Sequence, residues 1–182
     1  AMGPRGTMLH APDVYMDKIA VGGELPPDLI DIAAPPSANL TNLAKAKRVE
    51  VSDLVACILD RPRHAELIAK VREAGARIKL ISDGDISGVI ATSRPSSGVD
   101  IYIGSGGAPE GVLAAAALRC IGGQMQGKLI FRNEDEKKRA VNCGITDFGK
   151  VYDLNEMAKG DVMFAATGVT DGSMVKGVRR HG

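Results

Sequence analysis

The fold of this chain is decided by the stretch GSGGAPEG at residues 104–111. An apolar, β-branched run at 99–103 precedes it, and an alanine-rich segment at 112–118 follows it. This pattern predicts a strand, a glycine-rich turn and the first turn of a helix. Glycines let the backbone approach a ligand closely, and the free N–H groups of a first helical turn attract phosphate. We therefore expect an anion-binding turn here.

A carboxylate lies inside this turn. Pro109 suits the first helical position, where no N–H donor is needed, and Glu110 then falls in the first turn of the helix. A carboxylate and a phosphate repel each other unless a cation lies between them, so Glu110 indicates a metal-bridged phosphate site. The alternative is that Glu110 only complements the helix dipole, as acidic residues in first turns often do.

Strands and helices alternate along the rest of the chain, which predicts an α/β fold. The first forty residues hold most of the prolines and are expected to form only a short strand at 18–21. The pattern beyond them predicts strands at 54–59, 78–81, 99–103, 128–131 and 162–167, and helices at 39–47, 65–74, 86–92, 112–118 and 134–141. Such alternation is typical of a mostly parallel mixed sheet sandwiched by helices. By length, residues 1–182 are expected to form a single α/β domain.

The composition excludes several classes of function. Hydrophobic residues make up 45% of the chain and charged residues 25%, and 23 basic against 22 acidic side chains give a net charge of +1. This balance, with no Trp, three Tyr and three Phe, argues against binding to nucleic acid or to a membrane surface. The sequence has neither a secretory leader pattern nor a long apolar run, so a cytoplasmic location is expected.

Three cysteines, Cys57, Cys120 and Cys143, are far apart in the sequence. Metal-cluster spacings such as Cys-x-x-Cys are missing, so these thiols do not indicate a metal site. Cys57 lies in an apolar strand pattern and Cys120 in an apolar helix, which predicts that both are buried and inert.

Two loops that follow predicted strands carry charged residues. Arg61 and Arg63 flank Pro62, and paired arginines can bind a phosphate through forked hydrogen bonds, although two solvated arginines at a helix start would look the same. His64 is expected to be exposed and without a role. Asp83 and Asp85 flank Gly84, and their carboxylates could accept hydrogen bonds from sugar hydroxyls, hold a metal, or simply cap a short helix.

Two further stretches lie outside these loops. Tyr15 follows a proline- and acid-rich segment, and its phenol could bind a phosphate oxygen or simply pack in the interior. The stretch TGVTDG at 167–172 is explained as an ordinary turn and receives no role.

Five segments together resemble the class II fructose-1,6-bisphosphatase family (GlpX type), part of the lithium-sensitive, metal-dependent sugar phosphatase superfamily. They are APDVYMDK at 11–18, RPRH at 61–64, SDGD at 82–85, GSGGAPEG at 104–111 with AALRC at 116–120, and ATGVTDG at 166–172. Their order and spacing are similar to those of the family from residue 4 to residue 180. Several motifs in one order are far more specific than a single glycine-rich loop.

The resemblance implies a gluconeogenic hydrolase that removes the 1-phosphate of fructose 1,6-bisphosphate, and some relatives also accept sedoheptulose 1,7-bisphosphate. It implies a cofactor, Mg²⁺ or Mn²⁺, with Glu110 as a metal ligand, and a homo-oligomer. The residues it assigns to the substrate are Tyr15, Arg61, Pro62, Arg63, Asp83, Gly84, Asp85 and Gly107. The Asp-Pro-x-x-Gly-Thr-like metal loop of the superfamily is missing. The chain is therefore expected to be the larger C-terminal part, lacking the N-terminal half, the catalytic base and the last strands.

Two nucleotide-binding motifs are alternatives from local pattern. Residues 122–128 match most of a P-loop, but Leu129 replaces the magnesium-binding Ser or Thr, and the motif lies between a helix and a strand. A dinucleotide fingerprint begins at Gly104 and Gly106 but has Pro109 where a third Gly or Ala belongs. A nicotinamide-binding Rossmann-type domain is the first alternative on pattern alone, and a noncatalytic sugar-phosphate-binding module is the second.

Overall fold

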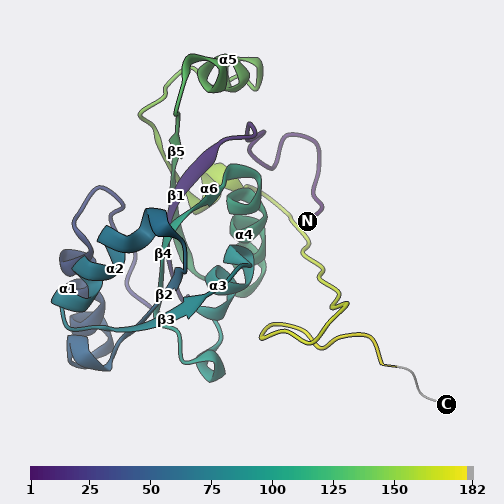
Figure 1. The fold of residues 1–182 in the computed structure, drawn as a ribbon. Helices are drawn as coiled ribbons and strands as arrows, with labels where there is room; N and C mark the ends of the chain where they lie inside the picture. The colour runs from purple at the N-terminus through teal and green to yellow at the C-terminus, as the bar shows by residue number, and fades with distance from the viewer. Residues whose placement is uncertain (180–182) are drawn as a thin grey trace.

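A computed structural model describes residues 1–179, and within them six strands form one mixed sheet in the order β3-β2-β4-β1-β5-β6 (Figure 1). The strands are β1 (Tyr15–Val21), β2 (Val55–Leu59), β3 (Arg77–Ile81), β4 (Ile101–Gly107), β5 (Gln124–Ile130) and β6 (Val151–Asp153). β2 pairs in parallel with β3 and β4, whereas β1 lies antiparallel between β4 and β5. β5 therefore runs in the same direction as β2, β3 and β4, and β6 is antiparallel to β5. The predicted mostly parallel mixed sheet is confirmed.

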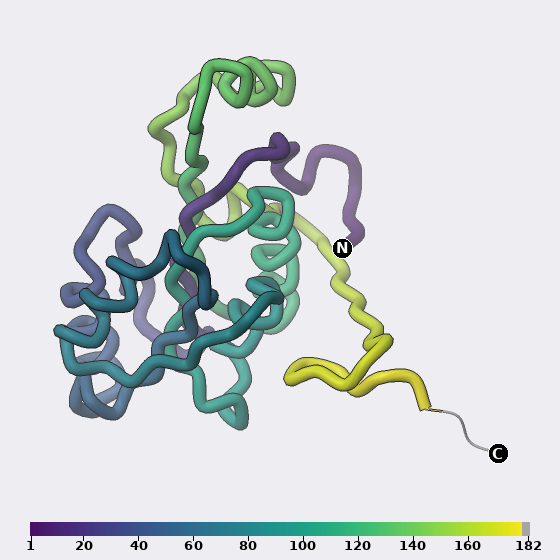
Figure 2. The backbone as a smooth tube through the Cα atoms, viewed as in Figure 1, coloured from purple at the N-terminus to yellow at the C-terminus, as the bar shows by residue number. Residues whose placement is uncertain are grey.

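Helices cover both faces of the sheet, as expected (Figures 1 and 2). α1 (Pro36–Lys47) and α2 (Ala65–Glu73) lie on one face, and α3 (Asp85–Ala91) and α4 (Ala108–Ile121) lie on the other. α5 (Glu134–Asn142) stands beyond the end of β5, and α6 (Leu154–Met157) follows β6. Short 3₁₀ turns span Val51–Asp53, Pro62–His64 and Pro95–Ser97. None of these helices is both long and apolar enough to cross a membrane.

β1 contributes side chains to two separate cores, one on each face of the sheet. Because side chains alternate along a strand, Ile19 and Val21 pack in the core beneath α1 and α2, whereas Met16 and Ala20 pack beneath α3 and α4. Lys18 shares the face of Met16 and Ala20 and is only 2% exposed. A lysine at this position needs a partner, since burying an unpaired charge is costly.

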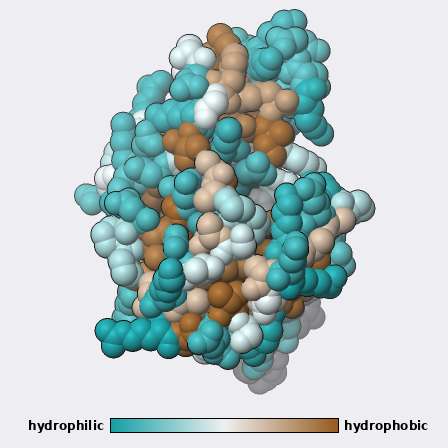
Figure 3. Space-filling model, turned by 90° about the vertical axis from the view of Figure 1, so that its left-hand side faces the viewer, coloured by the Kyte–Doolittle hydropathy of each residue, from teal (hydrophilic) through white to brown (hydrophobic). Residues whose placement is uncertain are grey.

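The side of the molecule that carries α1 and α2 is seen in Figure 3. Apolar patches are interspersed there among hydrophilic side chains. β1 and β4 are the two central strands of the sheet, and β1 is paired with β4 on one side and β5 on the other. The register of β1 with each neighbour therefore sets where β4 and β5 end, and so where the loops after them lie.

The C-terminal part of the chain departs from the sequence-based expectation. Residues 162–167 do not form a strand: only Met163 pairs there, in an isolated bridge with Met2. An apolar run of this length becomes a strand only where a sheet edge is available, and here the segment leaves the body of the protein as an extended tail (Figure 2). The loop at 167–172 therefore follows no strand. The sequence-based prediction instead missed β6 and α6, which are only three and four residues long.

Three further expectations concern Cys57, Cys120 and the dinucleotide-binding motif. Cys57 is buried as predicted, and burial raises the pKa of its thiol to about 11. The prediction for Cys120 is wrong, because this cysteine faces solvent in the last turn of α4. The glycine-rich stretch forms the end of β4 and not a turn, and β4 is separated from β5 by the antiparallel β1. A dinucleotide-binding βαβ unit places such strands in one parallel sheet without this reversal, so the Rossmann interpretation is not supported.

Candidate functional site

The loops singled out from the sequence meet at one edge of the sheet. β2, β3, β4 and β5 all end at this edge, and β1 begins there, because Tyr15 pairs with Gly107 on one side and Ile130 on the other. In open α/β sheets ligands bind at the carboxyl ends of the strands. We call the loops here the carboxyl edge. It gathers Tyr15 and the loops at 60–64, 82–85 and 107–110, with the addition of 131–133.

Tyr15 is the centre of the first cluster at this edge. The guanidinium carbon of Arg63 lies 4.9 Å from the centroid of the Tyr15 ring, and that of Arg132 lies 5.0 Å from it. Both distances are within the range of a cation–π interaction. The structure thus places Tyr15 and Arg63, two of the residues that the resemblance assigns to the substrate, beside each other. Arg132 was missed from the sequence, although its place directly after a strand and four residues before Glu136 was a usable signal.

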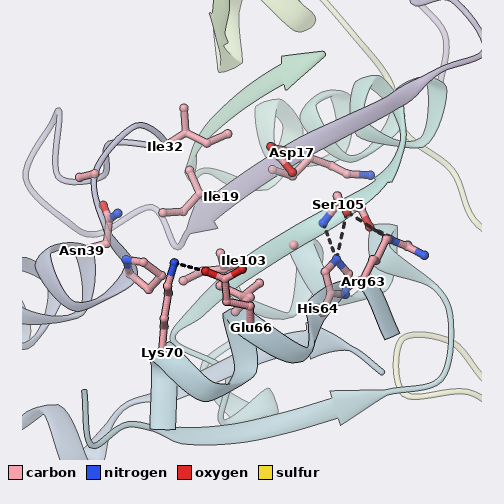
Figure 4. Close-up of a pocket in the computed structure, with 15 residues that line it drawn as sticks. Asp17, Ile19, Ile32, Asn39, Arg63, His64, Glu66, Lys70, Ile103 and Ser105 are labelled. Atoms are coloured by element: carbon pink, nitrogen blue, oxygen red, sulfur yellow. Dashed lines mark hydrogen bonds and ion pairs between the residues drawn. The ribbon is translucent and has the colours of Figure 1, made fainter. Parts of the chain in front are cut away.

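Within residues 1–179, all the side-chain hydrogen bonds of Arg63 go to one residue, Ser105. Its Nη2 donates to the backbone oxygen of Ser105 at 2.8 Å, and its Nε donates to the Ser105 hydroxyl at 3.1 Å (Figure 4). Both acceptors are neutral oxygens, so these bonds do not balance the positive charge of the guanidinium. Arg61 is placed differently, because its Nη1 donates to the backbone oxygen of Asp60 at 3.0 Å. The two arginines that flank Pro62 thus bond to different acceptors.

His64 was expected to be exposed, and this is wrong: it is 3% exposed. The 3₁₀ turn that starts at Pro62 directs its ring inward, where Nδ1–H donates to the backbone oxygen of Leu59 at 2.8 Å. Nε2 accepts the backbone N–H of Ser105 at 2.9 Å. Burial lowers the pKa of the imidazole, so the neutral ring connects the end of β2 to β4. It thereby fixes Ser105, the residue that holds Arg63.

Asp85 is buried, unlike Asp83 and Gly84 before it. Its carboxylate forms a buried ion pair with Lys18, and its other oxygen accepts the N–H of Ile86 at 3.0 Å. Lys18 also donates to the backbone oxygen of Gly107 at 3.0 Å. The pair thus ties β1 and the end of β4 to the start of α3. The alternative in which Asp85 caps the short helix is not formed, because the N-cap of α3 is Gly84.

Asp83 and Gly84 remain exposed on the loop before α3. Gly84 has φ +77°, a left-handed conformation that disfavours other residues. This turn lets the chain reverse between Asp83 and the inward-pointing Asp85. Of the three loop residues, Asp83 and Gly84 therefore have the access that a ligand requires.

Gly107 and Glu110 lie together at the start of α4. A Cβ atom on Gly107 would collide with Oε2 of Glu110, so the carboxylate folds back over the glycine. Glu110 is exposed. Pro109 occupies the second helical position instead of the first, because the helix begins at Ala108, whose N–H donates to the backbone oxygen of Val14 at 2.8 Å. The space above Gly107 is therefore filled by a carboxylate that is free to accept a ligand.

The donor set for a metal ion is incomplete within residues 1–179. No group of three or more His, Cys, Asp or Glu side chains is arranged there to hold a metal ion. Asp85 is paired with Lys18 and Asp83 is exposed on the loop before α3, which leaves Glu110 as the exposed carboxylate at the start of α4. These residues fit a metal as a source of one ligand and not as a whole site.

A cavity of about 310 Å³ lies beside the carboxyl edge, on the α1 and α2 face of the sheet (Figure 4). Ile19 and Ile103 form its floor, and Asn39 and Lys70 stand on its helical side. Asp17 points into it, and loss of water raises the pKa of this carboxyl. Of the predicted substrate residues, only Arg63 lines the cavity, so the cavity adjoins the predicted site without coinciding with it.

Comparison with known proteins gives one consistent result. Residues 1–182 match the model of the family described as bacterial fructose-1,6-bisphosphatase, glpX-encoded. Relatives from Synechococcus sp. strains JA-3-3Ab and JA-2-3B'a(2-13) are 42% and 43% identical over 198 aligned residues. A relative from Trichodesmium erythraeum strain IMS101 is 41% identical over 192 aligned residues. All three are named D-fructose 1,6-bisphosphatase class 2/sedoheptulose 1,7-bisphosphatase.

The alignments cover the whole chain but only part of each relative. They include 100% of this chain and 56% of each Synechococcus protein, and 98% of this chain and 55% of the Trichodesmium protein. The chain therefore spans about half the length of the curated relatives it matches. The family match agrees with the resemblance drawn from the five sequence segments.

Proposed function

The chain belongs to the bacterial, glpX-encoded fructose-1,6-bisphosphatase family, and from this premise we propose that it supplies the sugar-bisphosphate side of a phosphatase active site. The proposed reaction of the whole protein is hydrolysis of the 1-phosphate of fructose 1,6-bisphosphate to fructose 6-phosphate. The names of the relatives support sedoheptulose 1,7-bisphosphate as a second substrate. We also propose that the protein acts in the cytoplasm as a homo-oligomer and binds neither nucleic acid nor membranes.

The observation that carries this proposal is the position of Arg63 against the ring of Tyr15. A guanidinium held by neutral oxygens retains an unbalanced charge and presents a planar fork that matches a phosphate. The phenol of Tyr15 adds a hydroxyl that can hydrogen-bond a phosphate oxygen. In this proposal Arg63 and Tyr15 bind the phosphate that is not cleaved.

The remaining predicted residues take roles that follow from their exposure. Asp83 would accept hydrogen bonds from sugar hydroxyls, and Gly84 would let the backbone approach the sugar. Arg61 would add charge from the far side of Pro62. Asp85 would act through Lys18, because its carboxylate is already paired.

At the start of α4, Gly107 and Glu110 would form the end of the site where the phosphate is cleaved. Glu110 would provide one ligand to Mg²⁺ or Mn²⁺, and Gly107 the space that its carboxylate occupies. The metal would neutralise phosphoryl oxygens and activate water for in-line attack. Glu110→Gln keeps the shape but loses the anionic charge, so we expect phosphate release to fall by about 100-fold or more, with partial recovery at high metal concentration.

The proposal is tested by calorimetric titration of the protein with fructose 1,6-bisphosphate and, separately, with fructose. We expect saturable binding of the bisphosphate, none of fructose, and weaker bisphosphate binding in Arg63→Met. Lys45→Met, an exposed charge on α1, is the matched control and should bind as the unmodified protein does. Equal bisphosphate affinity in Arg63→Met and the unmodified protein would contradict the proposal.

A further inference from the structure

We propose that Arg132 is a second anion-binding residue, which grips, together with Arg63, the phosphoryl group seated at Tyr15. The ligand class is a dianionic phosphoryl group of a sugar bisphosphate, so this inference rests on the proposed function and extends its site. None of the five sequence segments that carry the family resemblance contains Arg132. The case for it comes from the contacts of its guanidinium.

The guanidinium groups of Arg63 and Arg132 converge on one aromatic ring. Arg63 extends from the turn after β2 and Arg132 from the end of β5, yet both lie within 5.0 Å of the centre of the same aromatic ring. The strand order explains this convergence, because Tyr15 at the start of β1 pairs with Ile130 at the end of β5. Arg132 follows Ile130 by two residues and therefore emerges beside Tyr15.

Arg132 is held by hydrogen bonds to Glu136. Nε and Nη2 donate to Oε1 of Glu136 at 2.8 and 2.5 Å, and the backbone N–H of Arg132 donates to Oε2 at 2.7 Å. These bonds use one edge of the guanidinium, which leaves the edge formed by its two Nη atoms for a second acceptor. Arg132 is 59% exposed, so that second edge is accessible.

Glu136 is almost fully buried, with a side chain only 1% exposed. Its backbone N–H donates to Oδ1 of Asn133 at 2.9 Å, which caps α5 and fixes the carboxylate. Hydrogen bonds from Arg132 lower the pKa of Glu136, so the carboxylate stays ionised near neutral pH. Glu136 is thus a positioning residue that presents Arg132 in one orientation.

The charges around Tyr15 favour an anionic ligand. Two guanidinium groups face one ring, and Glu136 pairs with Arg132 and, at 3.7 Å, with Arg139, but not with Arg63. Asp13 is a further carboxylate near Arg132. A dianion at Tyr15 would accept charge-assisted hydrogen bonds from both forks, which are about twice as strong as those to a neutral sugar hydroxyl. The cluster therefore selects a phosphoryl group at this position.

The inference is tested by following the Nε–H signals of Arg63 and Arg132 by nitrogen-15 NMR during titration of the unmodified protein with fructose 1,6-bisphosphate and with inorganic phosphate. We expect both signals to move with one dissociation constant in each titration. A shift of Arg63 alone would overturn the role of Arg132 and leave the proposed function intact. No shift of either signal with the bisphosphate would overturn both.

Variants separate binding from a purely structural staple between β5 and α5. Arg132→Met should weaken bisphosphate binding by about 10- to 100-fold, the range for hydrogen bonds to charged groups. Arg132→Lys should recover part of the loss, because it restores the charge without the fork. Lys138→Met, an exposed charge on α5, is the control and should bind normally. A lower unfolding free energy of Arg132→Met with unchanged affinity would contradict the inference.

Discussion

Two ion pairs at the carboxyl edge differ in what surrounds them. Lys18 and Asp85 are closed in between β1, β4 and α3, with side chains 1% and 11% exposed. In the Arg132–Glu136 pair the side chain with the carboxylate is 1% exposed, but the side chain with the guanidinium is 59% exposed. The first pair has no free donor pointing to solvent and serves to fix the strands. The second pair keeps one partner rigid so that the other can be offered to a ligand.

The largest effect is expected for Lys18→Met. Removing one member of a buried pair leaves the other charge uncompensated, so the unfolding free energy should fall by about 3–5 kcal/mol in urea denaturation. The double variant Lys18→Met/Asp85→Leu should recover most of this loss, because it removes both charges. Lys128→Met, an exposed lysine on β5, is the control. A loss below about 1 kcal/mol in Lys18→Met would show that the pair does not fix the sheet.

Neighbouring glycines sharpen the contrast between closed and open carboxylates. A Cβ on Gly106 would lie 2.5 Å from Oδ2 of Asp85, inside the buried pair, whereas a Cβ on Gly107 would meet only the exposed carboxylate of Glu110. Gly106→Ala should therefore cost about 1–3 kcal/mol of unfolding free energy, the range for overpacking. Gly107→Ala should cost less than about 1 kcal/mol, because Glu110 can swing away. Equal losses in the two variants, measured by urea denaturation, would contradict this assignment.

The turn that holds Arg63 is tested by Ser105→Ala. The variant removes the hydroxyl that accepts from Nε of Arg63 and lies 3.1 Å from Nε2 of His64, but it keeps the backbone oxygen that accepts from Nη2 and Nε. Loss of the hydroxyl's bond to Arg63 should weaken the binding of fructose 1,6-bisphosphate by about three- to tenfold, or roughly 1 kcal/mol. Calorimetry on Ser105→Ala and on the control Ser96→Ala, which lies in the distant 3₁₀ turn before β4, would measure this. Unchanged affinity would mean that the backbone oxygen alone holds Arg63.

The smallest expected effect is a pH dependence caused by His64. Its pKa in the fold is lowered below the ordinary value near 6.5, so between these two values the unfolded chain binds a proton that the folded chain does not. Stability should therefore fall as the pH drops from about 7 toward the lowered pKa, and be level above about 7. His64→Gln should remove this slope. His10→Gln, an exposed control, should retain it, and the same slope in both variants would rule out His64 as its cause.

The parts of this edge differ in how far the sequence could reveal them. The arginines around Pro62 and the alternation of strands and helices are local patterns, and the structure forms both. The stretch 104–111 was expected to begin with a glycine-rich turn, and this is wrong: residues 104–107 extend β4 along β1, and α4 follows directly from residue 108. The Lys18–Asp85 pair joins residues 67 positions apart, so only the strand order could reveal it. The same holds for Arg132, which reaches Tyr15 because β1 lies between β4 and β5.

Errors in the sequence-based account have related causes. His64 was expected to be exposed, but the 3₁₀ turn at Pro62 directs it toward Ser105. The run at 162–167 has the composition of a strand but finds only one bridging residue, Met2. Pairing partners that are distant in sequence decided both cases. Roles in substrate and metal binding remain predictions.

The central claim is that the carboxyl edge binds a sugar bisphosphate with one phosphoryl group at Tyr15. The most direct measurement is a crystal structure of the protein grown with fructose 1,6-bisphosphate and Mg²⁺. The account predicts one phosphoryl group within hydrogen-bond distance of the guanidinium groups of Arg63 and Arg132, and the other toward Glu110. A bisphosphate bound in the cavity beneath α1 and α2, with Tyr15 and Arg132 untouched, would contradict it.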